Sequence, residues 1–315
     1  MNKQKIVVIT GPTATGKTKL AISVAKAFNG EIISADSMQV YRGLNIGTAK
    51  PTPKEQALAP HHMIDMIDPT QPYSLAQYLK DAHTAAADIL RRGKLPVLAG
   101  GTGLYITSFV DYIKLSEQPV DLQLRGDLEQ LTSEKLLEEL NICDPQTAAR
   151  LSVNDRKRIL RAVEVYRSTG KTMSQHNEES KREQSPYDPV MIGLSFANRQ
   201  NLYDRIDARA EQMVEQGIME EAKYLLSLLS APTALQAIGY KEMAGVLAGT
   251  MTLEQGLDKL KQESRRYAKR QLTWFRRDQR IKWHMADEYA TFEVLEQDVM
   301  GYIRDIFNTY CRGGY

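Results

Sequence analysis

Apolar positions in the first hundred residues follow two alternating spacings. Short apolar runs bounded by turn residues are typical of buried strands, and they occur at residues 5–10, 31–35, 63–67 and 95–99. Between them, apolar residues recur at helical spacing over residues 17–28 and 75–92. Strands that alternate with helices favour an α/β fold, with a parallel sheet flanked by helices.

Capping residues define the second of these helices. Ser74 is its expected N-cap, because a serine hydroxyl accepts a hydrogen bond from an unpaired N–H of the first turn. Gly93 is its expected stop, because glycine adopts the left-handed conformation that ends many helices.

The pattern changes after residue 114. Helical spacing continues over residues 121–140, 144–151 and 154–169, with Gly170 as a stop and without a strand candidate. The polar stretch 174–189 is expected to be an exposed loop, and an apolar run at 190–196 predicts a return to the sheet. We therefore expect an α/β core, residues 1–114 and 190–315, with an inserted all-helical subdomain at 115–189.

The remaining chain is mostly helical by pattern. Helices are expected at residues 202–229 and 253–277, followed by a last strand at 281–284. No apolar run approaches the roughly 18 residues of a transmembrane helix. The N-terminal apolar run leads into a Gly-rich motif rather than a cleavage site, so it is interpreted as a strand and not a signal peptide.

The formal net charge of +2 is close to neutral, so the total charge does not indicate a nucleic-acid partner. The distribution of charge along the chain is more informative. Residues 150–182 contain nine Lys and Arg against four Asp and Glu, and residues 261–282 contain nine against two. Such stretches can follow a phosphate backbone, although on charge alone a solvated helix face is the favoured explanation. Cys143 and Cys311 lack the spacing of a metal site, and a reducing cytoplasm is expected.

The strongest motif is GPTATGKT at residues 11–18, which matches the P-loop pattern GxxxxGK[ST] between a predicted strand and a predicted helix. Its backbone N–H groups and helix dipole attract phosphate, Lys17 adds positive charge, and the Thr18 hydroxyl is placed to bind Mg²⁺. The motif predicts a di- or triphosphate site formed by Gly11, Pro12, Thr13, Ala14, Thr15, Gly16, Lys17 and Thr18.

Two further segments follow predicted strands and face the same crevice. Asp36 ends the second strand; such an aspartate positions Mg²⁺ in ATPases, acts as general base in a transferase, or only caps a turn. The loop AGGTGLY, residues 99–105, brings Thr102 toward the crevice, unless its glycines serve only a tight turn. His61 and His62 have no matching ligands nearby and are interpreted as non-catalytic.

Eight segments, in order and over nearly the whole chain, resemble the bacterial tRNA dimethylallyltransferases, also called isopentenyl-tRNA transferases. They are GPTATGKT, SADSMQVYRGLNIGTAKP, APHHMIDMIDP, YSLAQYLKDA, PVLAGGTGLY, NDRKRILRAVEVYRSTGK, AIGYKEM and YAKRQLTWFRR. Eukaryotic relatives carry a C-terminal zinc finger, whereas this sequence ends in IFNTYCRGGY. The resemblance implies transfer of a dimethylallyl group from its diphosphate to the N6 amine of the adenosine 3′-adjacent to the anticodon.

The resemblance also implies roles for individual residues. Asp36 is the expected base, while Lys17, the P-loop amides and Mg²⁺ held partly by Thr18 stabilise the leaving diphosphate. Arg209 is an expected diphosphate contact, although a surface ion pair is the alternative, and Thr102 matches a position near the reacting centre.

The acceptor adenosine must leave its stack to reach such a crevice. Ser37, Met38 and Gln39, beside Asp36, are expected to read it, and residues 236–241 to approach the RNA from another side. The insert is the expected clamp on the anticodon stem-loop, through Arg125, Arg156, Lys157, Arg158, Ile159, Leu160 and Arg161. The expected partners are tRNA and dimethylallyl diphosphate, without a membrane, for a monomeric protein.

Three other functions share parts of the pattern. A P-loop nucleoside or metabolite kinase shares the fold and the Mg²⁺ site but predicts ATP turnover. An RNA-binding ATPase explains the basic stretches and assigns Asp36 to the metal alone. A prenyltransferase acting on free adenine nucleotides needs no basic helical insert.

Overall fold

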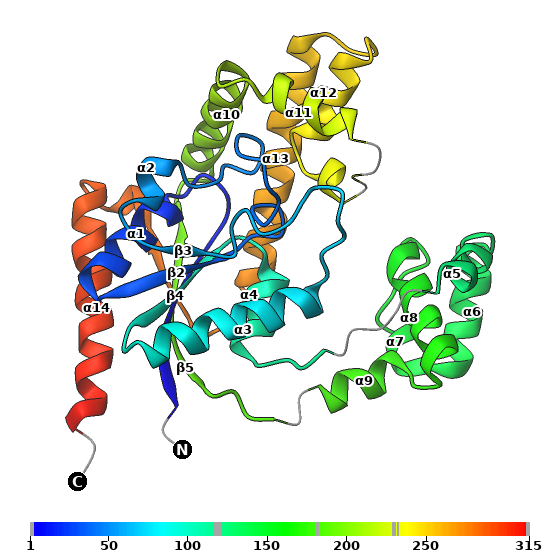
Figure 1. The fold of residues 1–315 in the computed structure, drawn as a ribbon, viewed down its shortest axis with the longest axis horizontal. Helices are drawn as coiled ribbons and strands as arrows, with labels where there is room; N and C mark the ends of the chain where they lie inside the picture. The colour runs from blue at the N-terminus through cyan, green and yellow to red at the C-terminus, as the bar shows by residue number, and fades with distance from the viewer. Residues whose placement is uncertain (1–2, 116–120, 181–182, 229–230, 232, 313–315) are drawn as a thin grey trace. The chain divides into compact units, whose positions relative to one another are not determined.

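The computed structural model describes residues 3–115, 121–180, 183–228, 231 and 233–312 (Figure 1). The chain divides into two compact units, one formed by Met1–Val110 with Pro186–Tyr315 and the other by Asp111–Ser185. The second unit therefore begins at residue 111 where 115 was expected, and ends at 185 where 189 was expected.

The core unit is built on a six-stranded sheet with the strand order β3-β2-β4-β1-β5-β6. The strands are β1 Gln4–Thr10, β2 Gly30–Ala35, β3 His61–His62, β4 Leu95–Gly100, β5 Tyr187–Ser195 and β6 Ile281–Met285. All paired neighbours are parallel, so the carboxyl ends of the strands meet at one edge. The expected α/β fold with a parallel sheet is confirmed.

Helices cover both faces of this sheet. The core helices are α1 Lys17–Ala27, α2 Pro53–Gln56, α3 Leu75–Arg91, α4 Gly103–Val110, α10 Arg199–Glu215, α11 Ile218–Ser227, α12 Tyr240–Leu247, α13 Leu253–Phe275 and α14 Phe292–Arg312, with 3₁₀ turns η1 Ala234–Gln236 and η2 Ala286–Glu288. Helices α1 and α14 pack on one face, and α3 and α4 on the other (Figure 1). Helices α10 to α13 stand beyond the carboxyl ends of the strands.

Local signals placed the ends of α3 correctly. The Ser74 hydroxyl accepts a hydrogen bond from the Gln77 N–H, and the Gln77 side chain accepts one from the Ser74 N–H, which is a capping box. Gly93 has a φ of 69° and follows the last turn. Residues close in sequence, the capping box at one end and the glycine at the other, therefore determine both ends of α3.

The strand predicted at residues 63–67 is wrong. Strand β3 contains only His61–His62, because Met63 and Asp65 have φ values of 65° and 52°. A left-handed backbone cannot continue an extended strand. Only Ile67 makes a bridge, to Tyr41.

The helix predicted at residues 202–229 is two helices, α10 and α11. Gly217, with a φ of 98°, lies between them and precedes Ile218, the first residue of α11. None of the helices in the described ranges is both long and apolar enough to cross a bilayer.

The described residues of the second unit form short helices around their own apolar core. The helices are α5 Leu122–Glu129, α6 Ser133–Cys143, α7 Pro145–Ala148, α8 Arg156–Thr169 and α9 Met173–Glu179. Leu128, Leu136, Leu140, Ile159 and Val163 are fully buried between them. An independent core of this kind agrees with an inserted subdomain of its own.

Two expectations for this unit need correction. The helix predicted at residues 121–140 is interrupted near Thr132, whose hydroxyl caps α6 through the Lys135 N–H. The stretch 174–189 is not all loop, because α9, started by the capping box of Thr172 and Gln175, extends to Glu179, and β5 already begins at Tyr187. The residues of α9 are mostly polar, which is why composition alone indicated a loop.

Candidate active site

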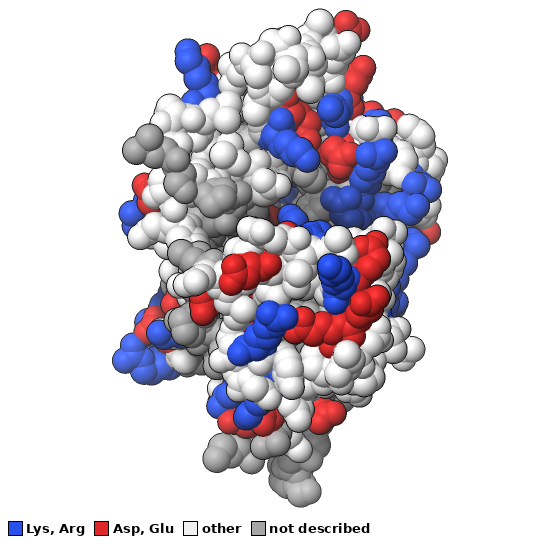
Figure 2. Space-filling model, turned by 90° about the vertical axis from the view of Figure 1, so that its right-hand side faces the viewer, with Lys and Arg blue, Asp and Glu red and all other residues white. Residues whose placement is uncertain are grey.

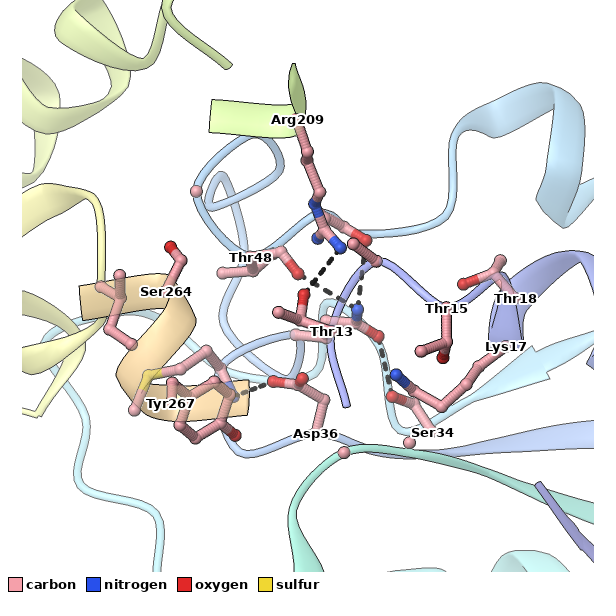
Figure 3. A pocket seen from close by; sticks show the side chains of 18 of the residues that line it. Thr13, Thr15, Lys17, Thr18, Ser34, Asp36, Thr48, Arg209, Ser264 and Tyr267 are labelled. Atoms are coloured by element: carbon pink, nitrogen blue, oxygen red, sulfur yellow. Dashed lines mark hydrogen bonds between the residues drawn. The ribbon is translucent and has the colours of Figure 1, made fainter. Parts of the chain in front are cut away.

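A pocket of about 550 Å³ lies in the core unit at the carboxyl ends of β1, β2 and β4. The P-loop forms one wall, the segment after β2 forms a second, and helices α10 and α13 complete it (Figure 3). In doubly wound α/β folds, this edge of the sheet is where ligands bind.

The P-loop has the backbone geometry that its motif predicts. Gly11 has a φ of 137°, and a Cβ atom there would lie 2.2 Å from the Leu194 carbonyl oxygen, so only glycine fits. Gly16, with a φ of 92°, leads directly into α1. Residues 13–18 line the pocket, whereas Gly11 and Pro12 lie behind it.

Lys17 lies in the pocket and forms no ion pair with a carboxylate of the described residues. Its Nζ donates a hydrogen bond to the Pro12 carbonyl at 2.6 Å, inside the curve of the P-loop. Burial and the nearby charge of Arg209 lower the pKa of Lys17 to about 7, and the Asp36 carboxylate opposes this shift. An anion in the loop would supply the missing negative charge, so this end of the pocket is suited to phosphate.

Arg209 reaches the same end of the pocket from α10. Its guanidinium donates a hydrogen bond to the Thr13 hydroxyl at 2.8 Å, and burial lowers its pKa against the attraction of Asp36. Arg205, one turn earlier, donates to the Ala14 carbonyl and is not part of the pocket wall. The structure thus brings Arg209 together with the P-loop, as expected for a diphosphate contact.

Asp36 lies between these cations and α13, with Lys17 on one side and Tyr267 on the other (Figure 3). Burial raises the pKa of the Asp36 carboxyl, while hydrogen bonds from the backbone N–H groups of Met38 and Gln39 lower it. The bond from Met38 measures 2.9 Å. A half-buried carboxylate with a raised pKa beside a P-loop is suited to act as a general base.

Ser37, Met38 and Gln39 line the pocket next to Asp36. The Gln39 side chain is held firmly, since it accepts from the Ser34 hydroxyl at 2.8 Å and donates to the Thr48 and Ala49 carbonyls at 3.3 Å. The segment is therefore pre-ordered on the wall that Asp36 shares.

Thr102 lies beside Asp36 but outside the pocket wall. Its hydroxyl accepts a hydrogen bond from the Ser37 N–H at 3.2 Å, and its own N–H donates to the Ala35 carbonyl at 3.1 Å. These contacts position the segment that carries Asp36, and a direct catalytic role for Thr102 stays a prediction.

Sequence reasoning missed two residues of α13 that help form the site. The Gln271 side chain accepts from the Thr13 N–H and donates to the Gly101 carbonyl, both at 2.9 Å. The Tyr267 hydroxyl is hydrogen-bonded to Thr102 and Gln271. Both residues are in the segment YAKRQLTWFRR, which was interpreted only through its basic residues.

A third missed residue, Glu221 of α11, holds the loop that follows the Asp36 segment. Its carboxylate accepts hydrogen bonds from the N–H groups of Asn45, Ile46 and Gly47, and from the Tyr240 hydroxyl. A lone glutamate on a helix carries no sequence signal for such a role.

Few side chains of the pocket wall are suited to bind a metal ion. The Thr18 hydroxyl and the Asp36 carboxylate line the pocket, and the described residues contain no group of three or more His, Cys, Asp or Glu that could hold an ion alone. This set fits Mg²⁺, which commonly takes most of its ligands from substrate phosphates and water. Thr18 lies next to Lys17, where a phosphate would bind (Figure 3).

The basic residues of the insert have different environments. Arg161 and Arg125 lie 2.8 Å and 3.9 Å from the buried Glu164 carboxylate, and Arg158 lies 3.8 Å from that of Asp155. Arg125, Lys157 and Arg158 are exposed. Figure 2 likewise shows Lys and Arg beside Asp and Glu over much of one face. Binding of tRNA through these cations stays a prediction.

The expectation that Ile159 and Leu160 contact tRNA needs correction. Both side chains are buried in the apolar core of the insert, with exposed fractions of 0% and 6%. Their helix presents its cations on the outside because this apolar stripe faces inward. They support the surface instead of forming it.

The fold and pocket define an α/β P-loop protein whose P-loop shares its pocket with a half-buried carboxylate. A family model described as IPP transferase matches residues 39–278, and one described as Isopentenyl transferase matches residues 4–63. The chain belongs to the IPP transferase family.

Individual relatives agree over nearly the full length. The chain is 44% identical over 306 residues to a tRNA dimethylallyltransferase of Caldanaerobacter subterraneus, covering 95% of this chain and 97% of that one. It is 49% identical over 294 residues to that of Heliobacterium modesticaldum, covering 91% and 92%.

Solved structures show the same similarity. A tRNA isopentenylpyrophosphate transferase from Bacillus halodurans has a TM-score of 0.74 and 41% identity, covering 98% of this chain and 99% of that one. A eukaryotic dimethylallyltransferase acting on tRNA has a TM-score of 0.75 and 32% identity, covering 86% and 70%.

Proposed function

We propose that this protein transfers a dimethylallyl group from dimethylallyl diphosphate to the N6 amine of the adenosine 3′-adjacent to the anticodon in tRNA, releasing diphosphate. The observation that carries the proposal is the position of Asp36, a half-buried carboxylate in the same pocket as the P-loop lysine and Arg209. The names of the relatives, tRNA dimethylallyltransferase, support transfer of a dimethylallyl group to tRNA.

The cationic end of the pocket acts on the leaving group. The P-loop N–H groups, Lys17 and Arg209 bind the diphosphate and offset the negative charge that develops as its bond to the allylic carbon breaks. Mg²⁺ bound by Thr18 and the diphosphate oxygens would add further positive charge there. Because Lys17 and Arg209 are already inside the pocket, little rearrangement opposes this stabilisation.

Asp36 acts on the acceptor. An exocyclic adenine amine is a weak nucleophile, because its lone pair is delocalised into the ring. As the new bond from N6 to the allylic carbon forms, the Asp36 carboxylate accepts a proton from N6. The N–H groups of Met38 and Gln39 orient that carboxylate, and its raised pKa improves it as a base.

The adenosine reaches Asp36 as a flipped nucleotide, since the half-buried carboxylate lies inside the pocket. Ser37, Met38 and Gln39 then form the wall beside the base. Arg125, Lys157, Arg158 and Arg161 of the insert bind the anticodon stem-loop through its phosphates. A tRNA substrate places the protein in the cytoplasm, and one chain carries all these residues, so we propose that it acts as a monomer.

The direct test is incubation with dimethylallyl diphosphate, Mg²⁺ and an unmodified tRNA that has adenosine beside its anticodon. Nucleoside mass spectrometry is expected to show a prenylated adenosine. Unmodified tRNA together with consumption of ATP in a parallel reaction would instead indicate a kinase or an ATPase.

A further inference from the structure

The first turn of the C-terminal helix α14 lies against the P-loop. A Cβ atom added to Gly16 would lie 2.8 Å from the Cε2 atom of Phe292, so the phenyl ring occupies the space beside the glycine. Gly16 lines the pocket, whereas Phe292 is half-buried and is not part of the pocket wall. The ring therefore touches the loop from the side that faces away from the ligand space.

Gly16 is the residue at which the P-loop turns into α1. Its φ of 92° is left-handed, and its carbonyl accepts a helical hydrogen bond from the Leu20 N–H at 3.1 Å. The N–H groups at the start of such a helix are the donors of an anion site. Glycine has more backbone freedom than any other residue and brings no side chain to restrict it. A contact from elsewhere in the chain can therefore determine how these donors are oriented.

The core of the protein holds α14 in a fixed position on α1 (Figure 1). Leu295, Val299 and Ile303 recur every four residues, are fully buried, and belong to the same apolar cluster as the buried residues of α1. Phe292 lies on the same face of the helix, about one turn before Leu295. The place of its ring is thus set by the core and not by a ligand.

Lys19 joins the same two helical turns. Its Nζ lies 4.4 Å from the centre of the Phe292 ring and 2.9 Å from the Glu293 carboxylate. A cation over an aromatic face is attracted to it, whereas an exposed ion pair adds little by itself. Because Lys19 belongs to the first turn of α1, the Phe292 ring is held between this turn and the P-loop glycine.

A second phenylalanine of α14 packs on the other end of α1. The rings of Phe307 and Phe28 meet edge-on with their centres 5.9 Å apart, and both side chains are half-buried. Phe28 directly follows the last residue of α1, so this contact lies at the end of the helix away from the P-loop. Phe292 and Phe307 thus pack against the same core, and of the two it is Phe292 that meets the phosphate-binding loop.

We propose that Phe292 is a positioning residue of the diphosphate site: its ring holds Gly16 in the left-handed conformation that orients the P-loop N–H groups toward the anion. The inference rests on the proposed function, in which this loop binds the diphosphate of the prenyl donor. A loop that is ordered in advance loses less entropy when its ligand binds. Without the ring, the glycine would have to be ordered by the ligand itself.

The test compares Phe292→Ala with Phe307→Ala, which removes the same side chain from the other end of the helix. Binding of inorganic diphosphate in the presence of Mg²⁺ is measured by calorimetry, and KM for dimethylallyl diphosphate and for tRNA by prenylation. Urea unfolding shows that both variants are folded and how much stability each has lost. The pair Phe292→Leu and Phe307→Leu repeats the comparison with a milder change, in case alanine prevents folding.

For Phe292→Ala we expect Kd for diphosphate and KM for dimethylallyl diphosphate to rise about tenfold, as when the backbone of one residue has to be ordered on binding. The value of kcat should change less than this KM, because the loop is ordered once the anion is bound. KM for tRNA should not change. Phe307→Ala should lose a similar amount of stability but bind diphosphate like the wild type. The leucine pair should differ in the same direction by a smaller factor.

Equal diphosphate affinities for the Phe292 and Phe307 variants would overturn the inference, because any effect would then follow the stability of α14 and not the contact with Gly16. A lower kcat with an unchanged Kd for diphosphate would also overturn it. If the wild type bound diphosphate without prenylating tRNA, the proposed function would fail, whereas the diphosphate affinities of the variants would still decide the role of Phe292.

Discussion

The side-chain oxygen of Gln271 accepts a hydrogen bond from the Thr13 N–H at 2.9 Å, so α13 holds the first part of the P-loop. The same amide donates to Gly101, in the loop after β4. One buried side chain therefore fixes the spacing of two loops that border the pocket. A helix far along the chain is in this way part of the phosphate site.

Replacing Gln271 by Ala should leave the Thr13 N–H and the Gly101 carbonyl without partners. Each unsatisfied buried group costs about 1–3 kcal/mol, so we expect lower stability and a higher KM for dimethylallyl diphosphate. Urea unfolding and donor kinetics measure the two effects. Gln262→Ala, at an exposed position of the same helix, is the control, and equal donor KM values for the two variants would contradict the role of Gln271.

Asp36→Asn should lower kcat by about 10²–10⁴-fold, the usual contribution of a general base. The asparagine oxygen can still accept the Met38 N–H, so the segment should keep its conformation. Binding of tRNA and of donor, measured by filter retention and by calorimetry, should stay close to that of the wild type. Loss of both binding and turnover would instead make Asp36 a structural or metal-binding residue.

The pH dependence of kcat/KM for the donor should have two limbs. As pH rises through about 7, free Lys17 loses its proton and its attraction for diphosphate, so kcat/KM falls. As pH decreases into the raised titration range of Asp36, the base becomes protonated and kcat/KM falls again. Lys17→Arg keeps its charge at all these pH values and should lose only the upper limb. An unchanged upper limb in that variant would exclude Lys17 as its source.

Removal of divalent ions with EDTA should abolish turnover, and Mg²⁺ should restore it. If Thr18 contributes a ligand, Thr18→Val should require about tenfold more Mg²⁺ for half-maximal rate, while Thr18→Ser, which keeps the hydroxyl, should behave like the wild type. A Mg²⁺ titration of initial rates separates the three proteins. Equal Mg²⁺ concentrations for half-maximal rate in Thr18→Val and Thr18→Ser would show that the Thr18 hydroxyl is not a ligand.

Glu31 offers a test of stability that is independent of the site, because it lies at the start of β2 and not at its carboxyl end. Its carboxylate is 3% exposed and binds Arg92, Lys94 and His62, the last two at 2.7 Å and 2.8 Å. Removing the charge by Glu31→Gln should cost about 1–3 kcal/mol, since the neutral amide accepts weaker hydrogen bonds than the buried carboxylate does from its partly exposed partners. Urea unfolding measures the loss, and kcat in the folded range should be unchanged.

The pKa of Glu31 gives the same contact a pH dependence. Hydrogen bonds from Arg92 hold this pKa well below its usual range. The stabilisation is therefore complete above the ordinary glutamate pKa and is lost as pH falls toward the lowered value. The free energy of unfolding of Glu31→Gln should therefore fall less between neutral and acid pH than that of the wild type. An equal fall in both proteins would contradict the contribution of Glu31.

The sequence was most informative where the determinants are close together along the chain. The P-loop and the ends of α3 depend on glycines and caps within a few residues of the element they control. Strand β3 was placed wrongly because Met63 and Asp65 adopt a left-handed backbone for which neither residue type gives a warning. The apolar run at 63–67 therefore resembled a strand by composition alone.

The missed parts of the site depend on contacts between distant residues. Thr13 and Gln271 are 258 positions apart, and Asn45 and Glu221 are 176 apart. Periodicity shows which face of α13 is buried but not which backbone group a buried glutamine meets. Asp36 was predicted from its place at the end of the second strand, whereas Arg209 was predicted because family resemblance supplied what spacing could not.

The position of the insert between α4 and β5 determines the order in which the sheet can form during synthesis. Strands β1, β2 and β4 leave the ribosome first, and β5, the other neighbour of β1, follows only after residues 111–185 have been made. Until then one edge of β1, the strand that leads into the P-loop, has no partner strand. The helical insert, which has its own core, can fold during that interval and bring β5 to an edge that is already formed.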